Sequence, residues 1–319
     1  MNSNFRMLLV GLASLVALSV LGRFLPGWFV FLLLTAFAKG IAALGLLLLI
    51  RCGLLSFGQG LFYCVGGYGA GLLMLWGGVT DAVLLVLAGG LVALVIGAIT
   101  APLLAGYRGI FFGMLTLALS MLAHGVLTKA DFLGGSDGLN LRPATFFGYK
   151  PVGARDSVYA LYLLTVVCVV ISAGAIRAHF ESVRGIMSLA VRDNEIRVEY
   201  LGASARRIIS ENFMVAAFLG GIGGAINALA VSHIDPELTF WTTSGEFVFV
   251  AILSGHLSVA AVFVSSILLE FIRSFSSQYF PNAWQLSLGL FMLASILFLP
   301  NGIGGLLFRK RRKSAKEQA

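Results

Sequence analysis

The sequence predicts an all-α integral membrane protein, a polytopic bundle of about ten transmembrane helices with one short helix on the cytoplasmic side. Three observations support this fold class. Apolar residues (AVILMFWYC) make up 59% of the 319 residues and charged residues only 11%, against about 45–50% and about 25% in typical soluble domains. The apolar residues occur in repeated runs of about the length that crosses a bilayer. The basic residues gather in the loops between those runs.

The composition also limits the binding partners. In a soluble protein a net charge of +8 would suggest nucleic acid. Here the charge lies in loops and indicates membrane topology, so we expect a lipid bilayer as the surroundings and no nucleic acid as a partner. The three cysteines form no CxxC pair and the four histidines are scattered singly. We therefore expect neither disulfides nor a metal site.

Nine apolar runs are clear candidates for spanning helices. They lie at residues 7–22, 28–50, 58–76, 82–106, 109–128, 158–177, 208–231, 257–275 and 284–300. The first follows Arg6 as a signal peptide would, but no typical cleavage site follows it, so we interpret it as a retained helix. The stretch 240–254 is a weaker tenth candidate because its apolar run after Glu246 is short.

Charge distribution favours ten crossings over nine. The segments 177–207 and 309–316 each contain six basic residues, and such segments are expected on the cytoplasmic side. An even number of crossings must then separate the two segments. Only three of the clear runs lie between them, so 240–254 must cross as well. The resulting topology has both termini in the cytoplasm.

One transmembrane domain over 1–319 accounts for the whole sequence. The outside loop 129–157 is rich in glycine and proline, which predicts turns. The inside loop 178–207 is expected to contain a short amphipathic helix that ends at Gly202. A basic cytoplasmic tail, 307–319, follows the last helix.

The sequence lacks the common enzyme motifs. It contains no GxxxxGK[ST] phosphate loop, no HExxH or GxSxG motif and no paired catalytic carboxylates, so we expect no enzyme and no nucleotide bound by this route. Charge at membrane depth is sparse. For Lys39 we favour a structural pairing with Glu270 or a partner subunit over a substrate role. For Glu246 we favour a cap at the N-terminus of a helix 246–254.

Polar residues inside the apolar runs are candidates for a solute pathway. Ser56 and Gln59 lie in a polar, small-residue break where the third run begins, and irregular backbone at membrane depth needs protein or water beside it. Thr116 and Ser120 share one face of the fifth run, and Asn227 lies within the seventh. The alternative for each is a hydrogen bond between helices.

Glycines four residues apart indicate close helix packing. Gly67 and Gly71 form one pair, and Gly220 and Gly224 form another. Small residues at this spacing let two helix backbones approach each other. We favour packing inside the bundle over a dimer interface.

Five stretches of sequence carry a resemblance to a known family. They are GLLSFGQGLF at 53–62, GIFFGMLTLA at 109–118, GGSDGL at 134–139, RDNEIRVEYLG at 192–202 and LPNGIGGL at 299–306. Together they resemble the permease subunits of branched-chain amino-acid ABC importers, the LivH/LivM family, and most of all its M-type subunit. The likeness covers residues from about 40 to 306, in order.

This resemblance implies a permease subunit in the cell inner (plasma) membrane that passes branched-chain or related small amino acids. It implies separate ABC ATPase subunits that hydrolyse ATP, a second related permease subunit, an extracytoplasmic substrate-binding protein, and no cofactor on this chain. Two alternatives stay open. One is a permease of the same family for urea or short amides, and the other is a stand-alone secondary carrier.

The resemblance also implies that the loop 178–207 carries a coupling helix that docks in a groove of the ATPase. The residues expected to contact the ATPase are Ile186, Leu189, Val191, Arg192, Asp193, Glu195, Ile196, Glu199 and Gly202. The apolar side chains are expected to anchor the helix in the groove, and the charged side chains to fix its position along the groove. The alternative is a helix lying on anionic lipid, which the three acidic residues disfavour.

Overall fold

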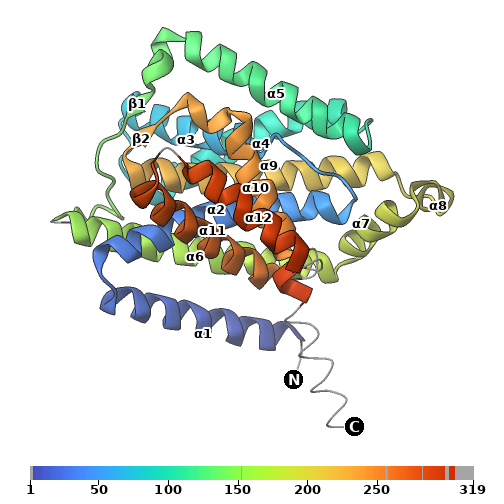
Figure 1. The fold of residues 1–319 in the computed structure, drawn as a ribbon, viewed down its shortest axis with the longest axis horizontal. Helices are drawn as coiled ribbons and strands as arrows, with labels where there is room; N and C mark the ends of the chain where they lie inside the picture. Colours follow the sequence, from blue (N-terminus) through green and yellow to red (C-terminus); the bar gives the residue numbers. More distant parts are fainter. Residues whose placement is uncertain (1–2, 152, 256–257, 282, 299–301, 306–319) are drawn as a thin grey trace.

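The computed structural model describes residues 3–151, 153–255, 258–281, 283–298 and 302–305, which form a helical bundle (Figure 1). Its α-helices are α1 (Ser3–Phe24), α2 (Gly27–Arg51), α3 (Gln59–Leu75), α4 (Ala82–Leu104), α5 (Gly109–Lys129), α6 (Ala154–Glu181), α7 (Val183–Asp193), α8 (Glu195–Tyr200), α9 (Ala205–Val231), α10 (Trp241–Ser254), α11 (Val259–Tyr279) and α12 (Trp284–Phe298). The 3₁₀ helices are η1 (Asp131–Leu133), η2 (Gly135–Asp137) and η3 (Pro236–Thr239). The chain is mainly helical, as expected.

Each of the ten apolar segments forms a helix, but the helices differ in length. Among the described residues, α2, α4, α5, α6, α9 and α11 are long and apolar enough to cross a membrane. By contrast, α10 has 14 residues and so reaches about 21 Å, less than the roughly 30 Å of a hydrocarbon core. The structure therefore supports a polytopic membrane protein with six candidate spans, and the count of ten crossings stays a prediction.

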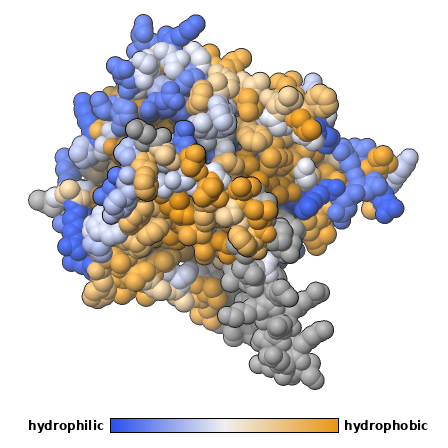
Figure 2. Space-filling model, in the orientation of Figure 1, coloured by the Kyte–Doolittle hydropathy of each residue, from blue (hydrophilic) through white to orange (hydrophobic). Residues whose placement is uncertain are grey.

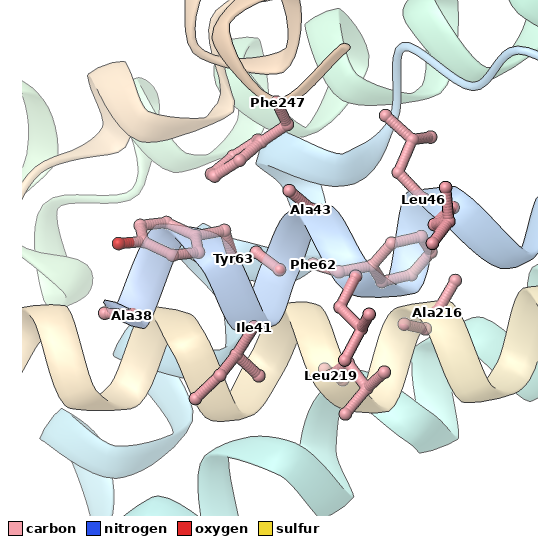
Figure 3. Packing of buried hydrophobic residues seen from close by; sticks show 14 of the residues in the cluster. Ala38, Ile41, Ala43, Leu46, Phe62, Tyr63, Ala216, Leu219 and Phe247 are labelled. Carbon is pink, nitrogen blue, oxygen red and sulfur yellow. The ribbon is translucent and has the colours of Figure 1, made fainter. Parts of the chain in front are cut away.

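The centre of the bundle is built on α2 and α9. The two helices pack along each other, and α9 also packs against α3 and α4. Figure 3 shows Ile41 of α2, Phe62 and Tyr63 of α3, Leu219 of α9 and Phe247 of α10 meeting in this core. Buried apolar side chains from several helices thus hold the elements that position the candidate site.

Glycines allow these helices to touch backbone to backbone. A methyl group on Gly224 would overlap the carbonyl oxygen of Tyr63, and one on Gly66 would overlap the carbonyl oxygen of Gly221. A methyl group on Gly67 would lie 3.5 Å from Ala228, on α9. The predicted role of the glycine pairs in packing the bundle is confirmed at these contacts.

The outer surface of the bundle is apolar between its two ends. On the face drawn in Figure 2, hydrophobic residues cover the middle and hydrophilic residues gather at the two ends of the helices. Exposed apolar side chains on α4, α5 and α12 include Leu91, Val95, Ile99, Ile110, Phe111, Met114, Leu286, Leu290 and Leu293. Such a surface suits lipid rather than water.

The loop 129–157, predicted to lie outside, contains the short elements η1, η2 and β1 (Leu139–Asn140). Strand β1 pairs antiparallel with β2 (His233–Ile234), Leu139 opposite Ile234. This pairing joins the loop to the C-terminal end of α9. The predicted basic tail at 307–319 and the start of the motif at 299–306 lie outside the described residues.

The inside loop differs from its prediction in one respect. Two helices, α7 and α8, replace the single expected helix, and Asn194 lies between them in an extended conformation (φ −161°, ψ 101°). The Asn194 side chain accepts a hydrogen bond of 3.0 Å from the Arg197 amide and so begins α8, as an N-cap residue does. Gly202 follows α8 with φ +85°, a left-handed conformation that suits glycine, so its predicted position at the helix end is confirmed.

Candidate functional site

Three of the five residues proposed for a pathway meet where α5 passes the start of α3 and η3. The Phe57 amide donates to the Thr116 hydroxyl at 3.0 Å, and the Ser120 hydroxyl donates to the Thr239 carbonyl at 2.6 Å. The Ser56 hydroxyl accepts from the Gly58 amide at 3.2 Å. We call Ser56, Thr116, Ser120 and Thr239, with the histidine described next, the polar seam.

His124 extends the polar seam by one more turn of α5. Its Nδ1 lies 3.2 Å from the Pro236 carbonyl oxygen and donates to it, and its ring meets Phe240 at 5.4 Å between centroids. Sequence reasoning missed His124, although its spacing of four residues from Ser120 continues the same face. The seam joins α5 to the irregular backbone that precedes α10.

The two remaining candidates lie elsewhere. Gln59 is 1% exposed, and its amide nitrogen donates to the carbonyl oxygens of Ala42 at 2.8 Å and Ala216 at 3.0 Å. It therefore ties the start of α3 to both α2 and α9. Asn227 is partly exposed on α9, apart from the polar seam.

A cluster of four charged side chains joins α2, α10 and α11. The Lys39 ammonium contacts a carboxylate oxygen of Glu270 at 2.8 Å and of Glu246 at 3.1 Å. Arg273 contacts the same Glu246 oxygen at 3.1 Å. We call Lys39, Glu246, Glu270 and Arg273 the charge cluster. Its two positive and two negative groups balance, as buried ions must.

The charge cluster confirms one prediction and corrects another. Lys39 does pair with Glu270. Glu246 is no cap, because α10 begins at Trp241 and places Glu246 in its second turn. The fold also brings two carboxylates onto one lysine from helices far apart in the chain. Among the described residues no group of His, Cys, Asp and Glu could hold a metal ion, so the cluster is an ion-pair network.

The segment 183–201 carries several exposed apolar side chains. In Figure 1, α7 and α8 extend beyond the end of the bundle. Exposed apolar side chains on them and at their ends are Val183, Ile186, Ile196, Tyr200 and Leu201, which we call the docking face. Among the other residues expected to contact a partner, Arg192, Asp193 and Glu199 are exposed and Leu189 is half-buried. Val191 is turned inward and is only 6% exposed, so it does not belong to the docking face.

A buried amide attaches α7 to the bundle. The Asn212 side chain of α9 donates to the Ser188 hydroxyl at 2.9 Å and to the Cys52 sulfur at 3.0 Å. Its oxygen accepts from His179 Nε2 of α6 at 3.1 Å. One residue thus joins α7 to α6, α9 and the end of α2. Sequence reasoning missed it, because no local pattern marks an asparagine near the start of a long helix.

Glu195 holds α8 against the bundle. Its carboxylate accepts hydrogen bonds from both Arg108 Nε, at 2.7 Å, and Arg108 Nη2. This hydrogen bonding and the positive charge of Arg108 hold the pKa of the Glu195 carboxyl below its usual range, against the smaller effect of burial. Glu195 was expected to pair with a partner protein; here it pairs within the chain.

Comparison with known proteins identifies the family of this chain. A family model described as "Branched-chain amino acid transport system / permease component" matches residues 28–299. The chain belongs to this family. The predicted resemblance is thereby confirmed, and the polar seam, charge cluster and docking face of this permease all lie within the matched range.

Two curated relatives align with this permease. It is 28% identical over 273 residues to the high-affinity branched-chain amino acid transport system permease protein LivM of Escherichia coli (strain K12) and 27% identical over 273 residues to that of Salmonella typhimurium (strain LT2). The alignments cover 79% of this chain and 64% of each relative, so the chain spans less than two thirds of the relatives' length. No solved structure matches it.

Proposed function

We propose that this chain is the M-type membrane subunit of an ABC importer and provides the inner-membrane path for branched-chain or related small amino acids. Membership of a family of permease components supports this proposal, as do the six long apolar helices. The proposed partners are two ABC ATPase subunits, which hydrolyse the ATP, a second related permease subunit and an extracytoplasmic substrate-binding protein. This chain itself carries no catalytic residues or cofactor in this scheme.

The docking face is the observation that carries the proposal. Five exposed apolar side chains gather on two short helices outside the membrane, where exposure to water is unfavourable. Apolar anchors in a partner's groove supply more binding energy than charges at the rim. The ATPase groove would therefore receive Ile186 and Ile196, with Leu189 beside them and with Arg192, Asp193 and Glu199 at the rim.

Motion of the docked ATPase would pass into the membrane through Asn212. Its hydrogen bonds reach Ser188, His179 and Cys52, and the Arg108–Glu195 pair adds a second connection at α8. Because these contacts are buried or charge-assisted, they are stiffer than a flexible linker would be. These contacts attach α7 and α8 to the bundle.

The polar seam is one proposed part of the path for solute. It places hydroxyl groups and a histidine beside irregular backbone, and such backbone within a bilayer needs protein or a water-filled cavity next to it. Ser56, Thr116 and Ser120 would line this path directly. Gln59 and Asn227 lie apart from the polar seam, and Gln59 holds the start of α3 in place.

A stand-alone secondary carrier is the second candidate, and the charge cluster is the observation that favours it. Buried carboxylates mark ion and proton pathways in many carriers. In this chain, however, Lys39 and Arg273 neutralise both carboxylates, and a single coupling cation that displaced either of them would leave that side chain buried without a partner. The permease family and the docking face both favour the ATP-driven importer.

Copurification with the ATPase tests the proposal. Ile186→Asp places a charge in the centre of the docking face, and we expect it to release the ATPase in detergent and to abolish ATP hydrolysis stimulated by the binding protein in liposomes. Ile186→Val keeps the apolar surface and is the matched control. Arg192→Ala should weaken binding less than Ile186→Asp. Full ATPase binding and coupling by Ile186→Asp would overturn the proposal.

A further inference from the structure

One buried hydroxyl beside the charge cluster has no hydrogen-bond partner. Tyr63 on α3 is fully buried, and its Oη makes no hydrogen bond within the described part of the chain. Buried polar groups are almost always hydrogen-bonded, because leaving one unpaired forfeits its bonds to water. The Tyr63 hydroxyl is therefore free to bond to a partner that is present only some of the time.

The position of Tyr63 relates its hydroxyl to the charge cluster. Its ring packs at a tilt against Phe247, the neighbour of Glu246 in α10, with 5.0 Å between the ring centroids. A methyl group on Gly223 would meet both the Tyr63 ring edge and the carbonyl of Ala38, the neighbour of Lys39. Figure 3 shows the hydroxyl extending to the side where Ala38 lies.

The charges of the cluster form an alternating row. Contacts run from Glu270 to Lys39, from Lys39 to Glu246 and from Glu246 to Arg273. Three different helices contribute: α2, α10 and α11. A molecule that carries one ammonium and one carboxylate can enter such a row by exchanging partners, without leaving any buried ion alone. A neutral solute cannot do this.

We propose that the charge cluster and Tyr63 together bind the charged groups of a zwitterionic amino acid during its passage. The carboxylate of the solute accepts from Arg273 and from the Tyr63 hydroxyl, and its ammonium donates to Glu246 and Glu270. Arg273 is the most exposed member, with 37% of its side chain accessible, so it is the first to exchange its partner. This inference rests on the proposed transport function and names its substrate class.

Two conservative variants separate a ligand role from a structural one. Tyr63→Phe removes only the unpaired hydroxyl, so a purely structural role predicts unchanged or higher stability. Tyr68→Phe is the matched control: its hydroxyl is also buried and has no partner among the described residues, but it lies five residues further along α3. Only Tyr63→Phe should affect ligand binding.

The measurement is binding of radiolabelled leucine to the purified importer, assembled with its ATPase and partner permease subunits but without the binding protein. Omitting the binding protein leaves the membrane subunits as the source of affinity. We expect Tyr63→Phe to weaken binding at least tenfold and Tyr68→Phe to leave it unchanged. Equal binding by Tyr63→Phe and the unmodified importer would overturn the inference, as would an unmodified importer that binds no leucine.

A competition series tests the need for both charges without any substitution. Unlabelled leucine should displace the label, whereas leucinamide, which lacks the carboxylate, and 4-methylpentanoate, which lacks the ammonium, should compete at least tenfold more weakly. Equal competition by either analogue, or by urea, would contradict recognition of a zwitterion. ATPase copurification is measured in parallel, because retained ATPase with lost leucine binding separates a failure of this site from a failure of the proposed importer function.

Discussion

Lys39 lies near the middle of α2 with 9% of its side chain accessible. An ammonium at this depth is tolerated only where it is paired, and both of its partners come from the last third of the chain. Glu246 has a second cation in Arg273, whereas Glu270 contacts only Lys39 among the described ion pairs. The two carboxylates therefore differ in how much they depend on Lys39.

This difference predicts the effect of removing the ammonium. Lys39→Met should destabilise the protein by about 3–5 kcal/mol, because it leaves the Glu270 carboxylate buried and unpaired. The folded fraction after detergent extraction, measured by size-exclusion chromatography and by thermal unfolding, reports the loss.

A compensating substitution controls for lost packing. Lys39→Met combined with Glu270→Gln removes both members of the closest pair, so most of the lost stability should return. A double variant as unstable as Lys39→Met alone would show that the ion pair is not the cause.

At the scale of one element, α8 depends on its neighbours. Its six residues are too few for a stable helix in water. The Asn194 cap, the buried Val198 side chain and the Arg108–Glu195 pair hold it in place. Of these, the ion pair is the contact that responds to pH.

The direction of the pH response follows from the lowered pKa of Glu195. A carboxyl whose pKa falls on folding stabilises the folded state above its unfolded pKa, about 4.3, and that contribution is lost as pH decreases through the lower folded value. We expect α8 to stay ordered at neutral pH and its amide hydrogen exchange, compared after correction for the intrinsic rate, to increase only below about pH 4.

Glu195→Gln should give that faster exchange already at pH 7, because the charge of the acceptor is lost. Glu199→Gln is the matched control, since Glu199 is exposed on the same helix. If α8 amides exchange equally slowly in both variants, Arg108 does not hold this helix.

At the scale of the whole molecule, the predicted topology places the outside loop and α7–α8 on opposite faces of the membrane. Ser136 and Asp193 are both exposed in these two regions. The native Cys52 and Cys64 are buried and Cys168 lies within α6. Single cysteines at the two exposed positions are therefore suitable reporters.

Labelling of Ser136→Cys and Asp193→Cys with a membrane-impermeant maleimide should occur from opposite sides, Ser136→Cys in intact cells and Asp193→Cys only after the inner leaflet is opened. The unmodified chain controls for reaction at the native cysteines. Labelling of both positions from the same side would exclude the ten-crossing topology with a cytoplasmic α7–α8.

The sequence by itself determined the class of protein, the ten helical segments and the family. These features depend on information that is local in the chain: the length of an apolar run, the glycine after α8, and short motifs such as RDNEIRVEYLG at 192–202. Even the pairing of Lys39 with Glu270 was one of the two alternatives that the sequence favoured, because few other charges lie at membrane depth.

Only the tertiary structure decided which residues meet. Lys39 and Glu246 are 207 residues apart, and the carbonyls that Gln59 binds lie on two other helices. Asn194 divides the inside segment because its extended backbone and capping side chain begin a new helix, and α7 then turns Val191 inward. Contacts of this kind depend on how helices pack against one another, and no periodicity within one helix encodes the neighbour that its polar side chains will find.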